Sequence, residues 1–98
     1  MKGRMIISID YDKTYTADPE GWKDFIEMMQ SRGHIVICVT NRVPLMGREV
    51  REELEHLVPI IFAGGELKDE AAKKIGFKVD VWIDDSPEMI RSIPILGK

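Results

Sequence analysis

The chain contains 98 residues, of which 44% are hydrophobic and 32% charged, and its formal net charge is −3. This length accommodates one domain but not two, and the composition is that of a folded globular chain rather than a disordered one. The negative net charge argues against generic binding to nucleic acids or anionic membranes through bulk charge, although it does not exclude a local basic patch.

Short β-branched runs alternate with helical periods along the chain, which indicates βα units around a parallel sheet. A first strand is predicted over residues 5–9. Asp18 and Pro19 fit the N-cap and the first position of a helix, and Gly33 fits the residue that ends it. The apolar residues between them fall on one helical face: Trp22, Phe25, Ile26 and Met29.

A second strand is predicted over residues 34–39, in the interior of the sheet because the run is apolar on both faces. A second helix is expected after Pro44 and before Pro59. The residues expected to face inward from this helix are Met46, Val50, Leu54 and Leu57.

A short third strand is predicted over residues 60–62, and Gly64 and Gly65 form the turn that follows it. A third helix is expected over residues 66–75, with Gly76 as its cap. Its expected inward residues are Leu67, Ala71, Ala72 and Ile75.

A fourth strand is predicted over residues 79–83, followed by a short helical turn that starts at Ser86 and Pro87. Residues 93–96 could form a fifth strand at the edge of the sheet, where Pro94 is tolerated. The pattern therefore predicts one α/β domain over residues 1–98. We expect a three-layer Rossmann-like fold with a short, mostly parallel central sheet.

The single cysteine, Cys38, lies in an apolar run and is expected to be a buried, reduced thiol. A reduced thiol suits a reducing compartment. No apolar stretch approaches the roughly 20 residues that a membrane-spanning helix needs, and no signal-peptide pattern is present at the N-terminus. We therefore expect a cytoplasmic protein without membrane association.

Polar residues collect where the predicted strands end. Asp10 and Asp12 follow the first strand, and Asp84 and Asp85 follow the fourth. Ligand sites of open parallel sheets form outside the carboxyl ends of the strands, so these four carboxylates should converge. They would repel one another without a cation. Oxygen ligands without a nearby histidine or cysteine favour Mg²⁺ over Zn²⁺.

The second strand ends in a hydroxyl, an amide and a guanidinium, from Thr40, Asn41 and Arg42. A carboxylate beside Mg²⁺ can attack a phosphoryl group and form an aspartyl-phosphate. A second carboxylate can act as general acid and then as general base. The pattern therefore indicates phosphoryl-transfer chemistry.

The order of these residues resembles the haloacid dehalogenase (HAD) superfamily of aspartate-nucleophile hydrolases. The resemblance covers most of the chain. It rests on the Asp10-x-Asp12-x-Thr14 motif after the first strand, Thr40 after the second, a downstream lysine, and Asp84-Asp85 after the fourth. It implies a HAD-like fold and a Mg²⁺-dependent phosphohydrolase acting on a phosphate monoester.

The resemblance also implies a role for each matching position. Asp10 would be the nucleophile and a metal ligand. Asp12 would be the acid/base, with its backbone carbonyl facing the metal. Asp85 would complete the metal site, with Asp84 beside it. Thr40 would be a catalytic residue that hydrogen-bonds the phosphoryl group. Beside these motif positions, three residues are expected to bind the substrate: Thr14, Asn41 and Arg42.

The family motif includes a lysine, and Lys68, which opens the third helix, matches it, with Lys73 and Lys74 as alternatives on the same helix.

Two features depart from the family pattern. Lys13 stands where the family commonly has glycine. The intervals between the motifs are used up by the predicted helices and strands, so the chain has no cap domain. In this family, an open site often accompanies a large substrate or an oligomer that supplies the lid.

Two other functions remain open. One is a non-catalytic or regulatory phospho-acceptor domain, like a response-regulator receiver. The order of the acids and the lysine disfavours a receiver, because receivers place the acceptor aspartate at the third strand and the lysine after the fifth. The other is binding to a nucleic-acid end. The net charge disfavours it, although four basic residues keep it open: Lys13, Arg42, Arg48 and Arg51. The substrate is not specified, and a homo-oligomer is not excluded.

Overall fold

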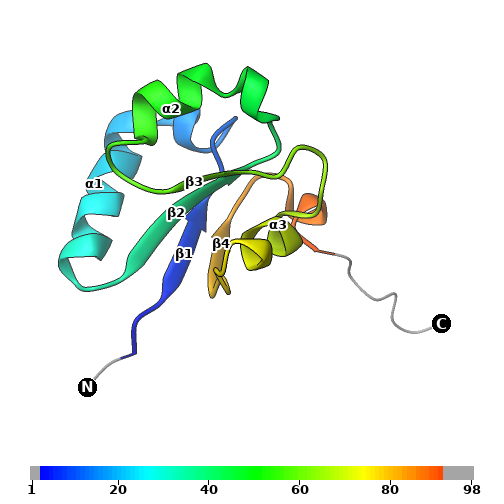
Figure 1. Cartoon of the computed structure of the whole chain (residues 1–98). Coiled ribbons are helices and arrows are strands. Elements are labelled where there is room, and N and C mark those ends of the chain that lie inside the picture. The colour runs from blue at the N-terminus through cyan, green and yellow to red at the C-terminus, as the bar shows by residue number, and fades with distance from the viewer. Residues whose placement is uncertain (1–2, 92–98) are drawn as a thin grey trace.

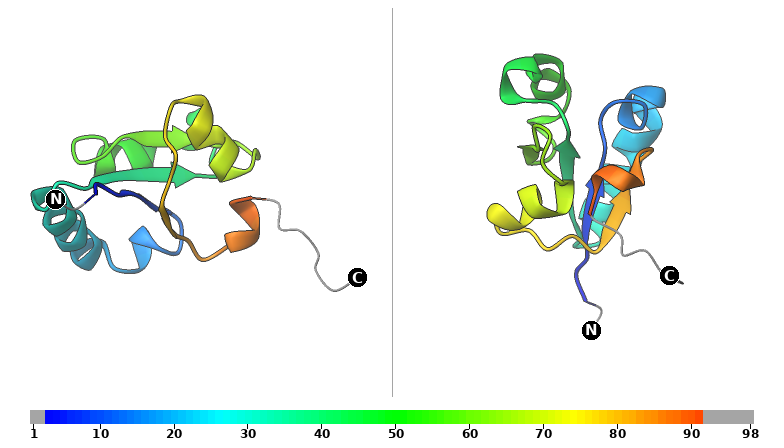
Figure 2. Two further views of the ribbon diagram at one scale, coloured as in Figure 1. Left: turned by 90° about the horizontal axis from the view of Figure 1, so that it is seen from below. Right: turned by 90° about the vertical axis from the view of Figure 1, so that its right-hand side faces the viewer.

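The β-branched runs of the sequence form one parallel sheet. The computed structural model describes residues 3–91 and contains the strands β1 (Ile6–Ile9), β2 (Ile35–Thr40), β3 (Ile60–Phe62) and β4 (Val81–Ile83). All neighbouring pairs are parallel, and the order across the sheet is β3-β2-β1-β4 (Figures 1 and 2). The prediction of a parallel α/β sheet is confirmed, with strand ends that differ by one or two residues.

Helices cover both faces of this sheet. Helices α1 (Pro19–Ser31) and α2 (Arg48–Leu54) pack on one face, and α3 (Lys68–Lys74) packs on the other (Figure 1). Three single turns of 3₁₀ helix complete the fold: η1 (Tyr15–Ala17), η2 (Pro44–Met46) and η3 (Pro87–Met89). The arrangement has the three layers expected of a Rossmann-like fold.

Strand β2 shows why the sheet needs helices on both faces. Val36 and Cys38 belong to the core under α1 and α2, whereas Ile37 and Val39 belong to the core under α3. Successive side chains of a strand point to opposite faces, so a strand that is apolar throughout must be covered twice. Cys38 is buried as a free thiol, as the sequence predicts.

Helix α1 begins and ends at the predicted signals. The side chain of Asp18 accepts a hydrogen bond from the backbone N–H of Gly21 at 3.1 Å, and Pro19 occupies the first helical position. Gly33 follows the helix with φ +90°, in the left-handed region that favours glycine. These local signals position the start of α1 after the segment that carries Asp10 and Asp12.

The predicted second helix was wrong in one respect. The chain divides it into η2 and α2, separated by Gly47. A Cβ atom at Gly47 would lie 2.2 Å from the ring of Phe62, so the chain needs glycine to pass this ring. Met46 is the last residue of η2 and lies outside α2, and its side chain is 64% exposed rather than inward, whereas Val50 and Leu54 are buried as predicted.

The third helix is shorter than predicted. It begins at Lys68 and its last helical residue is Lys74, so Ile75 is the C-cap and is 62% exposed instead of inward. Gly76 has φ +100° and ends the helix as expected. Ala71 and Ala72 are buried against the sheet. The predicted fifth strand lies outside the described residues.

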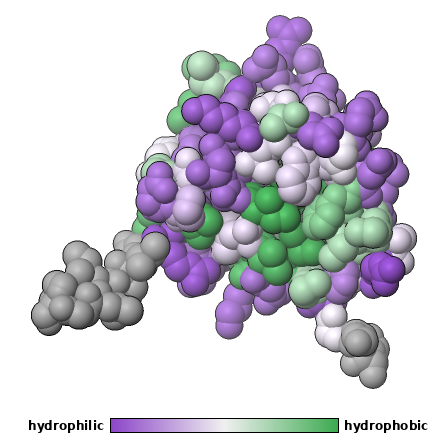
Figure 3. Space-filling model, turned by 180° about the vertical axis from the view of Figure 1, so that it is seen from behind, coloured by the Kyte–Doolittle hydropathy of each residue, from purple (hydrophilic) through white to green (hydrophobic). Residues whose placement is uncertain are grey.

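One face of the molecule exposes apolar side chains among polar ones (Figure 3). Trp22, Phe25 and Met29 are only partly buried against the core, and Met28 and Val81 are exposed. Trp22 and Phe25 pack edge to face, with ring centroids 5.6 Å apart.

Between residues 3 and 91, no helix combines the length and the apolar character needed to cross a bilayer.

Candidate functional site

Three strands deliver polar residues to the same edge of the sheet. Ile9 of β1 pairs with Cys38 of β2 and with Ile83 of β4, so the residues after these strands lie close together. The backbone N–H of Asp10 donates to the carbonyl of Ile83 at 2.9 Å, which continues the pairing past the end of β1. A cavity of about 190 Å³ lies at this edge, and it is lined by Asp10, Asp12, Lys13, Asn41, Lys68, Asp84, Asp85 and Ser86.

Three of the predicted carboxylates form one cluster. Asp10, Asp84 and Asp85 each offer an oxygen atom, and these three atoms lie within 4.8 Å of one another. Asp10 is buried, Asp84 is half-buried and Asp85 is exposed, so the cluster runs from the protein interior to solvent. Several carboxylate oxygens with an open side form the type of donor set that Mg²⁺ uses.

Lys68 is the cation at the base of this cluster. Its side chain comes from the first residue of α3, and the residue is 1% exposed. Its Nζ donates to Oδ1 of Asp10 at 2.8 Å and to Oδ2 of Asp84 at 2.5 Å. The alternatives Lys73 and Lys74 lie elsewhere, on the exposed side of α3, where they pair with Asp69 and Glu66.

Burial dominates the electrostatics of Asp10. Loss of solvent raises the pKa of Asp10 to about 6, the hydrogen bond from Lys68 opposes this rise, and the neighbouring acids Asp85 and Asp84 add to it. The cluster contains three carboxylates and only one ammonium group, which pairs with Asp10 and Asp84, so it has an excess of negative charge. A divalent cation would neutralise this charge and favour ionised Asp10.

Asp12 lines the same cavity, but its carboxylate is not in the cluster. Both of its oxygens accept from Arg42, from Nε at 3.0 Å and from Nη2 at 2.8 Å. Arg42 is itself held by the carbonyl of Met46 at 2.9 Å and by Glu49 at 3.0 Å. The hydrogen bonds from Arg42 keep the pKa of Asp12 below its usual value.

The other predicted residues take different places. Asn41 lines the cavity, and its Oδ1 is buried without a hydrogen-bond partner in the described chain. Thr40 and Thr14 are buried and are not among the lining residues. The Oγ1 of Thr40 accepts from the backbone N–H of Arg42 at 3.3 Å. Asn41 therefore offers a buried, unsatisfied oxygen at the wall of the cavity.

Two contacts of the site were not predicted. The backbone N–H of Ser86 donates to Oδ1 of Asp84 at 2.9 Å and fixes that carboxylate. Glu49, on α2, restrains Arg42 from the opposite side to Asp12. The sequence does not predict either contact, because both depend on how the loops after β2 and β4 turn.

Lys13 has an unusual backbone conformation. Its φ is +68°, in the left-handed region, and it is the only non-glycine residue with positive φ between residues 3 and 91. Its N–H donates to Oγ1 of Thr16 at 3.0 Å, which fixes the turn after Asp12. A side chain in this region costs about 1 kcal/mol. The turn therefore has the geometry for which glycine is the natural residue.

Replacing Lys13 with glycine is expected to leave the free energy of unfolding unchanged or to raise it by up to ~1 kcal/mol. The substitution relieves the strain at positive φ, while the flexibility of glycine in the unfolded chain offsets part of that gain. Urea denaturation measures the change. The same substitution at Lys23, in the middle of α1, should instead lower the free energy of unfolding by about 1 kcal/mol. A clear loss of stability with Lys13→Gly would contradict the strained-turn interpretation.

Comparisons of the chain with protein-family models, with curated proteins and with solved structures find no match.

Proposed function

We propose that the protein is a Mg²⁺-dependent phosphohydrolase of the HAD superfamily that acts on a phosphate monoester. The observation that carries this proposal is the grouping of Asp10, Asp84, Asp85 and Lys68 at one cavity. A nucleophilic carboxylate with further acids for a metal and a buried ammonium group is the set that phosphoryl transfer through an aspartate requires.

The proposed reaction proceeds in two displacements. A carboxylate oxygen of Asp10 attacks phosphorus, the ester oxygen leaves with a proton from Asp12, and an aspartyl-phosphate forms on Asp10. Asp12 then takes a proton from water, which attacks phosphorus and releases inorganic phosphate and free Asp10. Lys68 holds Asp10 in place and balances negative charge throughout.

Mg²⁺ would be held by Asp10, Asp84 and Asp85, with the backbone carbonyl of Asp12 as a further proposed ligand. The metal ion would neutralise the negative charge on the phosphoryl oxygens. The unpartnered oxygen of Asn41 and the gradient from buried Asp10 to exposed Asp85 support a site that is completed by a ligand. An exposed side suits the entry of a phosphate group.

The ion pair between Asp12 and Arg42 must open before Asp12 can donate a proton. As long as Arg42 holds both oxygens, the carboxylate is ionised and turned toward the guanidinium. A phosphate group in the cavity is an anion that can compete for Arg42, because guanidinium groups bind phosphate and carboxylate alike. We therefore assign Arg42 to substrate binding.

The same ion pair supports a second function. If Arg42 never released Asp12, Asp10 would accept a phosphoryl group but water would not be activated to remove it. The chain would then be a regulatory phospho-acceptor domain. A stable aspartyl-phosphate on Asp10 without turnover would identify this function.

Hydrolysis of p-nitrophenyl phosphate tests the proposed function. We expect turnover with Mg²⁺ that EDTA abolishes, since the carboxylates alone cannot neutralise the phosphoryl oxygens. If this generic substrate is inert, beryllium fluoride with Mg²⁺ should still form a stable adduct on Asp10, visible as a rise in the melting temperature. Activity that persists in EDTA, or the lack of both turnover and adduct, would contradict the proposal.

A further inference from the structure

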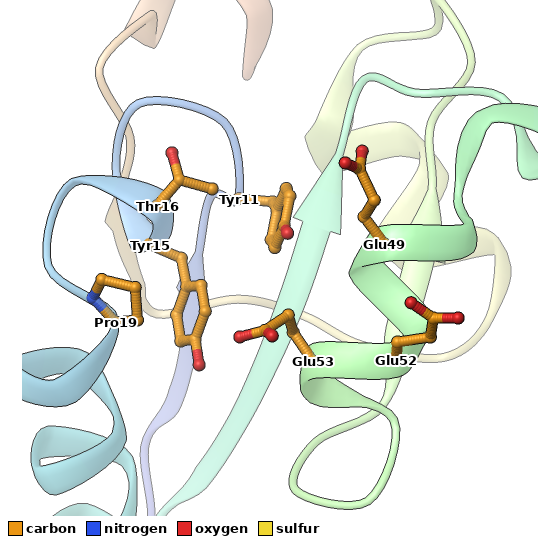
Figure 4. A pocket seen from close by; sticks show the side chains of 7 residues that line it. All are labelled: Tyr11, Tyr15, Thr16, Pro19, Glu49, Glu52 and Glu53. Carbon is orange, nitrogen blue, oxygen red and sulfur yellow. The ribbon is translucent and has the colours of Figure 1, made fainter.

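A second cavity lies next to the candidate site, in the groove between η1 and α2. It has a volume of about 300 Å³ and is lined by Tyr11, Tyr15, Thr16, Pro19, Glu49, Glu52 and Glu53. Figure 4 shows Tyr11 and Tyr15 on one side and the three glutamates of α2 on the other, with the side chains of Tyr15 and Glu53 turned toward each other. The proposed reaction uses none of the glutamates.

The cavity combines negative charge with aromatic rings. Glu49 is paired with Arg42, and Glu52 is paired with the exposed Arg48. Glu53 has no ion-pair partner within the part of the chain that the structure describes. The rings of Tyr11 and Tyr15 stack with their centroids 5.7 Å apart. A carboxylate beside aromatic rings attracts a positively charged group.

The hydroxyl of Tyr15 is poorly satisfied in this structure. The residue is 1% exposed, and its hydroxyl makes no hydrogen bond of normal geometry among residues 3–91. Burial raises the pKa of this hydroxyl to about 12, and the carboxylate of Glu53, which faces it, adds to the rise. A buried hydroxyl without a partner costs free energy, and such groups are rare in native structures. Tyr15 lines the cavity, so a ligand that accepts or donates a hydrogen bond there would satisfy the hydroxyl.

The lining of this cavity suits an organic cation better than a metal ion. Glu49, Glu52 and Glu53 do not bring three carboxylate oxygens within 4.8 Å of one another, whereas the aspartate cluster does. A metal ion also needs several oxygen ligands at 2–2.6 Å, which a cavity of about 300 Å³ with aromatic walls does not provide. An alkylammonium group fits both the size and the apolar surface.

The two cavities flank one short segment of chain. Tyr11, which lines the second cavity, lies between Asp10 and Asp12, which line the first. Arg42 joins the two cavities, since it pairs with Asp12 on one side and with Glu49 on the other. The Arg42 guanidinium also lies 5.2 Å from the ring centroid of Tyr11. Arg42 therefore lies between the two cavities and contacts residues of both.

We propose that the cavity between η1 and α2 binds an ammonium group, and that the substrate is a phosphate monoester that carries a protonated amine. The second clause rests on the proposed phosphohydrolase function. The phosphate occupies the cavity of Asp10 and Lys68, and the ammonium group contacts Glu53 and the Tyr15 hydroxyl. Arg42 then leaves Asp12 and Glu49 to bind the phosphate, which frees the acid/base and exposes Glu49 to the cation.

Matched phosphate esters test this substrate class. For the Mg²⁺-loaded protein, kcat/KM is measured on ω-aminoalkyl phosphates of two to six carbons and on n-alkyl phosphates of the same lengths. We expect a preference of about fivefold to tenfold for the amine at its best length, the size of one cation contact at a half-solvated site. Glu53→Gln should reduce this ratio toward one, and Glu55→Gln, at the exposed end of α2, should retain it.

A binding measurement keeps this test separate from the test of the proposed function. Butane-1,4-diammonium is titrated into the Mg²⁺-loaded protein, with butane-1,4-diol as the uncharged control, and the tyrosine resonances are followed by NMR. We expect the diammonium ion, but not the diol, to shift the resonances of Tyr11 and Tyr15, and Glu53→Gln to weaken this effect at least threefold. The proposal is overturned if the diammonium ion leaves these resonances unchanged.

Each remaining outcome is decisive for one of the two proposals. Hydrolysis of both ester series with equal kcat/KM overturns the amine-bearing substrate and leaves the phosphohydrolase in place. Hydrolysis of neither series, together with diammonium binding at the tyrosines, overturns the phosphohydrolase and supports the cation site. Tyr15→Phe separates a role of the hydroxyl in binding from a role in stability. It should weaken diammonium binding while the melting temperature stays unchanged or rises, because the buried hydroxyl makes no hydrogen bond of normal geometry with the described residues that the substitution could remove.

Discussion

Replacing Asp10 with asparagine is expected to abolish phosphate-ester hydrolysis, by a factor of at least about 10³, without unfolding the protein. Asparagine has the shape of aspartate but cannot form the acyl-phosphate. The fold should be retained or even stabilised in the absence of metal. Burial raises the pKa of Asp10 to about 6, so an ionised carboxylate at neutral pH is unfavourable there.

The Asp10→Asn experiment combines two measurements on the same protein. Turnover of p-nitrophenyl phosphate with Mg²⁺ reports the chemistry, and thermal unfolding with and without Mg²⁺ reports the fold and the metal site. We expect the stabilisation by Mg²⁺ to fall together with turnover, because one of the three clustered carboxylates is lost. Asp24→Asn, on α1, is the matched control and should behave as the native protein. Full activity of Asp10→Asn would exclude Asp10 as the nucleophile.

Replacing Lys68 with methionine is expected to cause the largest loss of stability of any single change at the site. Burial by itself would lower the pKa of Lys68, but its hydrogen bonds with Asp10 and Asp84 raise it overall, so the ammonium group is charged. Methionine fills a similar volume and leaves two buried carboxylates without their cation. Breaking a buried ion pair in this way costs about 3 kcal/mol or more, a large part of the 5–15 kcal/mol that holds a small domain folded.

Urea denaturation of the metal-free protein at pH 7 measures the loss in Lys68→Met. Because the unfavourable feature is the unpaired negative charge, the double variant with Asp10→Asn should recover part of the lost free energy. Lys73→Met is the control on the same helix. Its ammonium group is largely exposed and pairs with Asp69 one turn away, so the change should stay within about 0.5 kcal/mol. Equal effects of the two substitutions would show that Lys68 does not balance the buried carboxylates.

Asp10 and Lys68 are expected to affect stability in opposite directions. Asp10 is unfavourable for stability and is proposed to be essential for chemistry, whereas Lys68 supports both. Residues that cost stability but persist in a cavity are typical of functional sites. Tyr15, beside the neighbouring cavity, is a second such residue, because its buried hydroxyl makes no hydrogen bond of normal geometry with residues 3–91.

Most of the fold could be predicted because its signals are local. The β-branched runs, the Asp18-Pro19 start of α1 and the glycines at positions 33 and 76 each act within a few residues. The errors at Met46 and Ile75 have a common cause, since helical periodicity does not show where a helix begins or ends. The contact of Gly47 with the ring of Phe62, which interrupts the second helix, is a tertiary contact.

The sequence by itself determined which residues stand at the strand ends, because the order of hydrophobic runs dictates a parallel sheet and the chain leaves every such strand at the same edge. Asp10, Asn41 and Asp84 could therefore be assigned to one cavity. Only the tertiary structure decided which charges meet. It turned Asp12 toward Arg42 and away from Asp84 and Asp85, and it placed Lys68 rather than Lys73 between the acids. Ion pairs form over distances of about 3 Å, and such distances depend on loop geometry and burial, which residue spacing does not specify.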